Sequence, residues 1–430
     1  MSLAHRLGTF APHQTPRQAP ESSLTSAVHQ QLLTTLGDQL YGDVLDSRAL
    51  EGAVFDAIST VLETQDGPVT AGDRARIAQE VTDDILGHGP LEPLLRDPEI
   101  TEIMVNSYDL IYIERDGLLH QTDLRFIDED HLRRTIDRIV SAVGRRVDES
   151  SPMVDARLPD GSRVNAVIPP VALDGCSLTI RKFAVEPYTA RDLISMGTIT
   201  PEAMDLISAC VRGRLSILIS GGTGSGKTTT LNVLSSFIPP GERIVTIEDA
   251  AELQTHQPHV VRLESRPLNV EGNGAVTIPA LVRNALRIRR DRIVVGEVRD
   301  AAAVDMLQAM NTGHDGSLTT VHANSPRDAL SRIETMVMMA DLDLPVRVIR
   351  EQIAGALHLL VHAARLRDGS RHITSISEVA GLDGETIVTQ ELFNFEYSAS
   401  APNGHLGQLV ATGFQPGFTD KLRDRGVLLP

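Results

Sequence analysis

Residues 221–228 read GGTGSGKT, and this stretch decides how the surrounding chain is expected to fold. It matches the full P-loop pattern of a glycine, four residues, and then Gly-Lys-Thr. An apolar run, Leu215–Ile219, precedes the loop, and a helix-forming stretch, Thr229–Phe237, follows it. A strand, a glycine-rich loop and a helix in that order build a cradle for nucleotide phosphates. The sequence therefore predicts a site for ATP and Mg²⁺.

Each residue type in the loop has a chemical task. The glycines let backbone N–H groups turn inward around the phosphates, and the following helix adds the positive end of its dipole. Lys227 is expected to reach the β- and γ-phosphates, and the Thr228 hydroxyl is expected to ligate Mg²⁺. The residues predicted to bind the nucleotide are Gly222, Thr223, Gly224, Ser225, Gly226, Lys227, Thr228 and Thr229.

Three later strand-like runs lead to a polar residue, as strands of a nucleotide-binding sheet do. The runs are 244–247, 293–295 and 318–321, and they lead to Glu248, Glu297 and His322. In open α/β sheets, ligands bind at the carboxyl ends of the strands. Glu297 is the predicted Walker B acid and general base, and Glu248 is predicted to polarise or hold the attacking water. His322 is a candidate sensor of the γ-phosphate, with a structural histidine as the open alternative.

Cations are also needed to balance the charge on a transferring phosphoryl group. Arg157 and Arg163 flank a turn at residues 159–161, and Arg181 lies in the strand-like run 177–183. A guanidinium group binds phosphate oxygens in a bidentate manner, which an ammonium group does not. These arginines are therefore candidates for phosphate binding, and ordinary surface positions are the alternative.

The pattern of the chain predicts four segments. Residues 1–24 are rich in Pro, Gln and Ser, which predicts a disordered tail, and apolar stripes at helical spacing predict a small helical bundle at 25–88. Residues 89–190 mix strand and helix patterns and predict an α+β domain. Residues 195–430 alternate strands and helices, which predicts an α/β domain with a parallel sheet. Turns at Asp368-Gly369 and Asp383-Gly384 predict hairpins that extend this sheet in antiparallel fashion.

Composition excludes some classes of function. The chain has 430 residues with 40 basic and 57 acidic side chains, a net charge of −17, which argues against general binding to DNA or anionic lipid. The basic run from Arg283 to Arg292 is expected to be an exposed helix face rather than a nucleic-acid site, because no aromatic residues interleave with it. No apolar run approaches the roughly 18 residues of a spanning helix, so a soluble or peripheral protein is expected.

Cysteine usage bears on metal and redox chemistry. The chain contains Cys176 and Cys210 and no CxxC pair. Two cysteines cannot form a four-cysteine zinc module within one chain, and they form no disulfide framework. A reducing cytoplasm is therefore expected, with no zinc site.

Four ordered motifs resemble those of a known family. They are GGTGSGKTTT (221–230), TIEDAAEL (246–253), VVGEVRD (294–300) and TTVHANS (319–325). Their order is similar to that in the secretion ATPase superfamily of type II secretion, type IV secretion and type IV pili. Three N-terminal segments, at 89–106, 157–170 and 177–183, resemble the CpaF/TadA branch, the motors of tight-adherence (Flp) pili.

The resemblance implies properties that composition does not. Members of the superfamily are hexameric rings at the cytoplasmic face of the bacterial inner membrane. ATP sits between an α+β N-terminal domain and a RecA-like C-terminal domain, and closure drives a membrane platform protein. Arg163, in GSRVNA, and Arg181, in LTIRK, match family arginines that reach the phosphates, and Arg157 matches less well. The resemblance also supports Glu297 as the catalytic acid with Glu248 as its helper, and His322 as a site residue.

Other readings stay open at this stage. A conjugation-type ATPase of type IV secretion shares all four motifs, although the helical segment before residue 87 favours the pilus branch. A nucleotide switch that binds ATP without hydrolysing it would need neither Glu297 nor Glu248. A DNA-translocating motor is disfavoured by the acidic balance and by the absence of Trp. Sequence does not distinguish pilus extension from retraction.

Overall fold

The computed structural model describes residues 87–429, except 116, 184–186, 267, 269–272, 314, 341 and 398–406, and also the single residues Thr60, Gln79 and Asp83. The tail expected at 1–24 and nearly all of the bundle expected at 25–88 lie outside the described residues. The chain divides into two compact units at Phe183 and Ala184, called here the N-terminal and C-terminal units. Within the described ranges, no helix is both long enough and apolar enough to cross a membrane.

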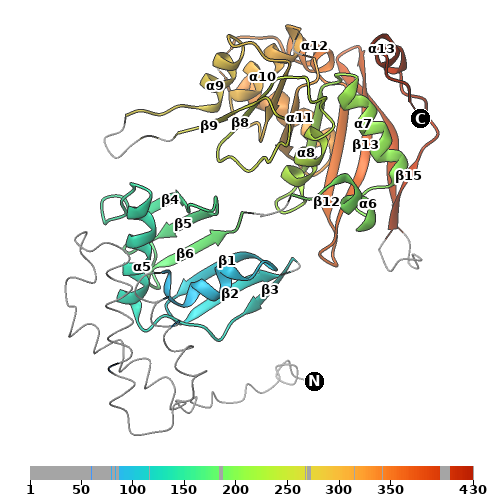
Figure 1. Ribbon diagram of the computed structural model, residues 1–430. Coiled ribbons are helices and arrows are strands. Elements are labelled where there is room, and N and C mark those ends of the chain that lie inside the picture. Colours follow the sequence, from blue (N-terminus) through green and yellow to red (C-terminus); the bar gives the residue numbers. More distant parts are fainter. Residues whose placement is uncertain are drawn as a thin grey trace, which may run out of the picture. The chain divides into compact units, whose positions relative to one another are not determined.

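The N-terminal unit is built on an antiparallel sheet with the strand order β3-β2-β1-β6-β5-β4 (Figure 1). Its described elements are η3 (Gly89–Leu91), α4 (Glu92–Arg96), β1 (Ile100–Ser107), β2 (Leu110–Arg115), β3 (Leu118–Gln121), α5 (Glu129–Ala142), β4 (Met153–Arg157), β5 (Arg163–Val167) and β6 (Ser177–Arg181). Asp128 caps α5 by accepting the His131 N–H at 2.7 Å. The buried face of α5, with Leu132, Ile136 and Ile139, packs into one core with the inward residues of the sheet.

The C-terminal unit is built on a larger sheet with the order β15-β14-β13-β12-β7-β11-β10-β8-β9. Its strands are β7 (Ile217–Gly221), β8 (Ile244–Glu248), β9 (Val260–Glu264), β10 (Arg292–Val295), β11 (Leu318–His322), β12 (Leu359–Arg365), β13 (Arg371–Asp383), β14 (Thr386–Tyr397) and β15 (Gly407–Ala411). Its described helices are α6 (Ala190–Ser195), α7 (Pro201–Arg212), α8 (Lys227–Ser235), α9 (Ile278–Ala285), α10 (Ala302–Asn311), α11 (Pro326–Met338), α12 (Val346–Ala356) and α13 (Thr419–Asp424).

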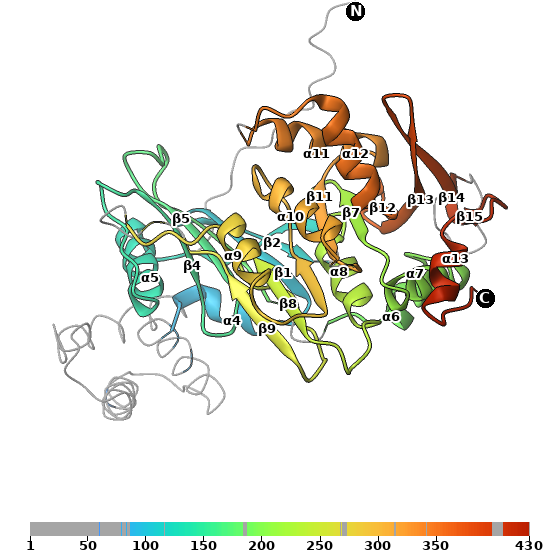
Figure 2. The ribbon, with the colours of Figure 1, turned by 90° about the horizontal axis from the view of Figure 1, so that it is seen from above.

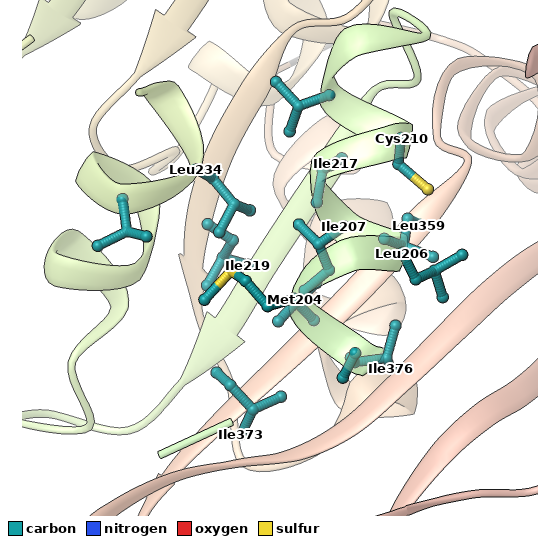
Figure 3. Packing of buried hydrophobic residues seen from close by; sticks show 14 of the residues in the cluster. Met204, Leu206, Ile207, Cys210, Ile217, Ile219, Leu234, Leu359, Ile373 and Ile376 are labelled. Carbon is teal, nitrogen blue, oxygen red and sulfur yellow. The ribbon is translucent and has the colours of Figure 1, made fainter. Parts of the chain in front are cut away.

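Strand β7 lies inside this sheet and is covered on both faces. Ile217 and Ile219 point into a cluster with α7 and α8, whereas Leu218 points into a cluster with α9 to α12. Figure 3 shows the first cluster, in which Ile207 of α7 and Leu234 of α8 lie close to Ile219. The two groups of helices lie on opposite faces of the sheet, as Figure 2 also shows. A strand buried on both faces reads as a continuous apolar run, which is why Leu215–Ile219 predicted it.

The expected antiparallel extension is confirmed. β12 runs parallel to β7, and β13 and β14 then return in antiparallel pairs through the turns at Asp368-Gly369 and Asp383-Gly384. Both glycines adopt positive φ angles, 86° for Gly369 and 59° for Gly384, which a residue with a Cβ atom adopts poorly. The consequence for the site is that β12, late in the sequence, lies directly beside the P-loop strand.

The expectation that the basic run forms one exposed helix face holds for Arg283 and is wrong for the arginines after it, most clearly for Arg292. Helix α9 ends at Ala285, and Arg292 begins strand β10 with its side chain fully buried. Its guanidinium pairs with the Glu242 carboxylate and donates to the Val211 carbonyl at 2.8 Å and the Gly316 carbonyl at 3.2 Å. A buried charge requires such a set of partners. All three lie 24 residues or more away in the sequence, so the local pattern could not indicate them.

Candidate active site

The P-loop joins β7 to α8 at the carboxyl end of the parallel strands. Gly226 caps α8 with φ at 91°, and Gly224 has φ at 69°, so both positions favour glycine. Gly221 has a different constraint, because a Cβ atom there would collide with the Ala363 carbonyl oxygen and the Ser225 hydroxyl. Glycine is thus favoured at positions 224 and 226 by a positive φ angle, and at position 221 by close packing against β12.

The polar groups of the loop suit a phosphate ligand. The Lys227 ammonium donates to the Gly222 carbonyl at 2.8 Å, so it lies against the loop rather than in solvent. Ser225 Oγ is buried and has no hydrogen-bond partner in the described part of the chain. Thr228 and Thr229 lie in the first turn of α8, where hydroxyl groups can meet a phosphate or a bound Mg²⁺. Buried polar atoms without partners usually mark a missing ligand or water, so this donor set fits Mg²⁺-ATP.

Three neighbouring strands bring the other predicted residues to the same edge. The order β7-β11-β10-β8 is parallel throughout, and His322 of β11 is in register with Gly221 of β7. Glu248 ends β8, and Glu297 follows β10 by two residues. The sheet therefore gathers the P-loop, Glu248, Glu297 and His322 at one edge of the C-terminal unit.

Glu248 is a buried carboxylate with one oxygen satisfied and one not. Oε1 accepts the backbone N–H groups of Glu252 at 2.9 Å and Leu253 at 3.0 Å, whereas buried Oε2 has no partner among the described residues. Burial raises the pKa of Glu248, and the two backbone hydrogen bonds oppose that shift. The side chain rests on Gly296, since a Cβ atom there would come within 2.9 Å of Glu248 Cγ. Oε2 is thus a candidate partner for a water molecule.

Glu297 is oriented by an arginine two residues later. Oε2 of Glu297 accepts from Arg299 Nε at 3.0 Å and from Nη2, and Nη1 of the same guanidinium lies 3.6 Å from Asp249 Oδ2. Both bonds from Arg299 use Oε2, and Oε1 of Glu297 has no partner in the described ranges. The carboxylate is therefore fixed through one oxygen, and the other is available to accept a proton.

The two predicted arginines are neighbours in the N-terminal unit. Arg163 of β5 is directly opposite Arg181 of β6 and also opposite Arg157 of β4. Residues directly opposite in an antiparallel pair point to the same face, where like charges repel. The sheet thus aligns three guanidinium groups in one row, which continues on β1 with Glu102, the acid directly opposite Arg181.

Sequence reasoning missed three residues on β12 and β13. His362 is buried, and its Nδ1 lies 2.8 Å from Ser220 Oγ in the P-loop strand. Burial lowers the pKa of His362, and the nearby Lys227 charge adds to that shift. Arg371 Nε donates to the Gly224 carbonyl at 2.9 Å, and Arg365 lies close to the same glycine. The Asp368-Gly369 hairpin was visible in the sequence, but its register against β7 was not.

Replacing Glu248 with alanine is expected to lower the free energy of unfolding by about 1–3 kcal/mol, because the buried N–H of Leu253 and the partly buried N–H of Glu252 lose their acceptor. Urea unfolding of the full chain measures this. Glu248→Gln is the matched control, since its amide oxygen can still accept both bonds. Equal stability of the alanine and glutamine variants would contradict the assigned role of Oε1.

Comparisons with known proteins identify the family of the chain. Residues 84–388 match the family model described as type II/IV secretion system protein. A putative conjugal transfer protein of Mycobacterium tuberculosis is 41% identical over 307 residues, which cover 70% of this chain and 87% of that protein. The type IV secretion system protein VirB11 of Brucella suis is 31% identical, covering 67% of this chain and 88% of the relative.

A solved structure supports the fold. The Yersinia pseudotuberculosis ATPase DotB matches with a TM-score of 0.50 at 17% identity, covering 71% of this chain and 80% of that one. The predicted α/β class, with a RecA-like C-terminal fold, is thereby confirmed. With the family match covering most of the chain, the conclusion is direct: this chain belongs to the type II/IV secretion system protein family.

Proposed function

We propose that this chain is a motor ATPase that hydrolyses ATP to ADP and phosphate and uses the energy to assemble a tight-adherence type IV pilus. The observation that carries the ATPase proposal is the single sheet edge that holds the P-loop, Glu248, Glu297 and His322. A nucleotide-binding loop alone would serve a switch. A buried acid and an oriented acid beside it supply what hydrolysis needs.

The residues divide the chemistry among them. The P-loop N–H groups and Lys227 would hold the phosphates in place. Glu297 would accept a proton from the attacking water through Oε1, while Arg299 keeps the carboxylate oriented. Glu248 Oε2 would position that water, and His322 would contact the γ-phosphate. Thr228 would ligate Mg²⁺, which when bound neutralises phosphate charge.

The arginine row of the N-terminal unit is proposed as a further phosphate-binding element. Arg163 and Arg181, with Arg157 as the weaker candidate, are supported by their register on adjacent strands and by the family motifs in which they stand. Their proposed task is to stabilise charge on the transferring phosphoryl group.

For Arg163→Ala we expect turnover to fall roughly tenfold or more, which is the effect of losing one charge-assisted hydrogen bond. The fold should stay intact, because Arg163 contributes no apolar core. Phosphate release by the full-length protein measures this, and circular dichroism checks the fold. Arg134→Ala, on the exposed side of α5, is the matched control. ATPase rates unchanged within error would show that Arg163 does not act on phosphate.

Assembly and location are part of the same proposal. We place the working form as a homohexamer at the cytoplasmic face of the bacterial inner membrane. It would be attached there through pilus platform proteins. The net charge of −17 gives no support to nucleic acid as a partner. The same ATP cycle would serve pilus retraction as well as assembly, if the platform reverses its response.

A conjugation-type ATPase of type IV secretion is the second candidate. It is favoured by the sequence similarity to a putative conjugal transfer protein and to the type IV secretion system protein VirB11. Deleting the gene in its host and restoring either the wild-type or the Lys227→Ala chain separates the two. Loss of surface pili that only the wild type restores supports the pilus motor. Loss of plasmid or effector transfer with normal pili would contradict the pilus motor and support the conjugation-type ATPase.

A further inference from the structure

Two arginines flank the P-loop from a hairpin that is distant in sequence. In the parallel pair of β7 and β12, Gly221 is in register with Ala363, and β12 continues for two more residues to Arg365. Strand β13 then begins with Arg371, directly opposite Arg365. Since β7 ends where the loop begins, this end of the hairpin stands beside the loop itself.

Both side chains reach the loop. Arg371 Nε donates to the Gly224 carbonyl at 2.9 Å, and a Cβ atom on Gly226 would lie 3.6 Å from Arg371 Cδ. A Cβ atom on Gly224 would lie 3.5 Å from Arg365 Nη1. The Arg371 guanidinium therefore contacts the middle of the loop, and the Arg365 guanidinium lies close to the same glycine. Both arginines are exposed to solvent, so a ligand in the loop can reach them.

The charge arrangement points to an anion. Arg365 and Arg371 place two positive groups directly opposite each other on neighbouring strands, beside the loop. Each guanidinium carries five N–H donors. The neighbouring loop binds phosphate through its backbone N–H groups. A phosphate chain held by the loop would meet these two guanidinium groups, whose fork geometry is the one that phosphate oxygens prefer.

We propose that Arg371, together with Arg365, binds the phosphate chain of the nucleotide, as a second cationic wall of the site opposite the His322 side of β7. The bond to Gly224 also fixes the Gly224–Ser225 peptide plane, because a trans peptide is rigid. This inference rests on the proposed function, since it assigns two more residues to the same nucleotide site. It predicts that the contribution of Arg371 grows with the number of phosphates on the ligand.

The test compares nucleotide affinities of full-length variants by calorimetry at fixed ionic strength. For Arg371→Ala, the Kd for ADP should rise about tenfold or more, the usual effect of losing a hydrogen bond from a charged group, and the Kd for AMP should rise less. Arg365→Ala should act in the same direction. Arg371→Lys should restore part of the affinity, because it keeps the charge and loses the fork.

Arg367→Ala is the matched control, since Arg367 is exposed in the same hairpin and makes no contact with the loop in the described part of the chain. Its ADP affinity should equal that of the wild type. An unchanged Kd for Arg371→Ala would overturn the proposal. So would equal losses for ADP and AMP with no rescue by lysine, because Arg371 would then act only on loop shape.

The failure of this inference and of the proposed function are distinguishable with Lys227→Ala. Suppose that the wild type binds ADP, that Lys227→Ala weakens ADP binding and that Arg371→Ala leaves ADP binding unchanged. The arginine proposal alone then fails. If the wild type binds no ADP at all, both proposals are overturned.

Discussion

Replacing Lys227 with alanine is expected to abolish ATP turnover, with a loss of at least about 100-fold, comparable to removing a main electrostatic stabiliser of a transition state. The ammonium group lies at the first residue of α8 and donates to the Gly222 carbonyl at 2.8 Å, so it is already held at the loop. Nucleotide phosphates would replace that carbonyl as its partner. Without Lys227 the loop keeps its backbone donors but loses its own positive charge.

Phosphate release by the purified full-length protein measures this effect. Lys421→Ala is the matched control, because Lys421 is an exposed lysine of α13 in the same unit. The control should retain wild-type turnover. Near-normal turnover in Lys227→Ala would contradict the assignment of the P-loop as the catalytic nucleotide site.

Replacing Glu297 with glutamine is expected to reduce turnover by about 10²- to 10⁴-fold while ATP binding is kept. Glutamine preserves shape and can still accept from Arg299 through its amide oxygen, so the loop after β10 should keep its conformation. It cannot accept a proton from water, which removes the general base. The loss therefore falls on the chemical step and not on the affinity for ATP.

Single-turnover hydrolysis and equilibrium ATP binding together separate these two quantities. Glu202→Gln, an exposed acid in the first turn of α7, serves as the matched control. A variant Glu297→Gln that hydrolyses ATP at the wild-type rate would exclude Glu297 as the base. In that case Glu248, with its unpartnered Oε2, becomes the acid to replace next.

The parts of the site that lie on short local patterns were predictable. Each of β7, β8, β10 and β11 is a short, buried, strand-like run, and a polar site residue or the P-loop follows within two residues of its last apolar side chain. Because a parallel sheet aligns carboxyl ends, finding the runs was enough to place Glu248, Glu297 and His322 at one edge with the P-loop. Their proposed catalytic roles stay predictions.

The parts that depend on long-range pairing were not predictable. β12 begins 138 residues after Gly221, and nothing in its local pattern says that it pairs with β7. His362, Arg365 and Arg371 therefore gave no signal of proximity to the loop. The prediction that Arg292 is exposed was wrong for a related reason. Its burial depends on Glu242 and on two backbone carbonyls that only the folded chain brings together.

The central claim is that this sheet edge hydrolyses ATP rather than only binding it. Steady-state phosphate release by the purified wild-type chain, with Mg²⁺-ATP and again after Mg²⁺ is removed with a chelator, tests it most directly. The account predicts many turnovers per chain with Mg²⁺, and none above the Glu297→Gln background without it. Tight binding of ATP without hydrolysis, with the same rate of ATP release in the wild type and in Glu297→Gln, would contradict the claim. The chain would then be a nucleotide switch.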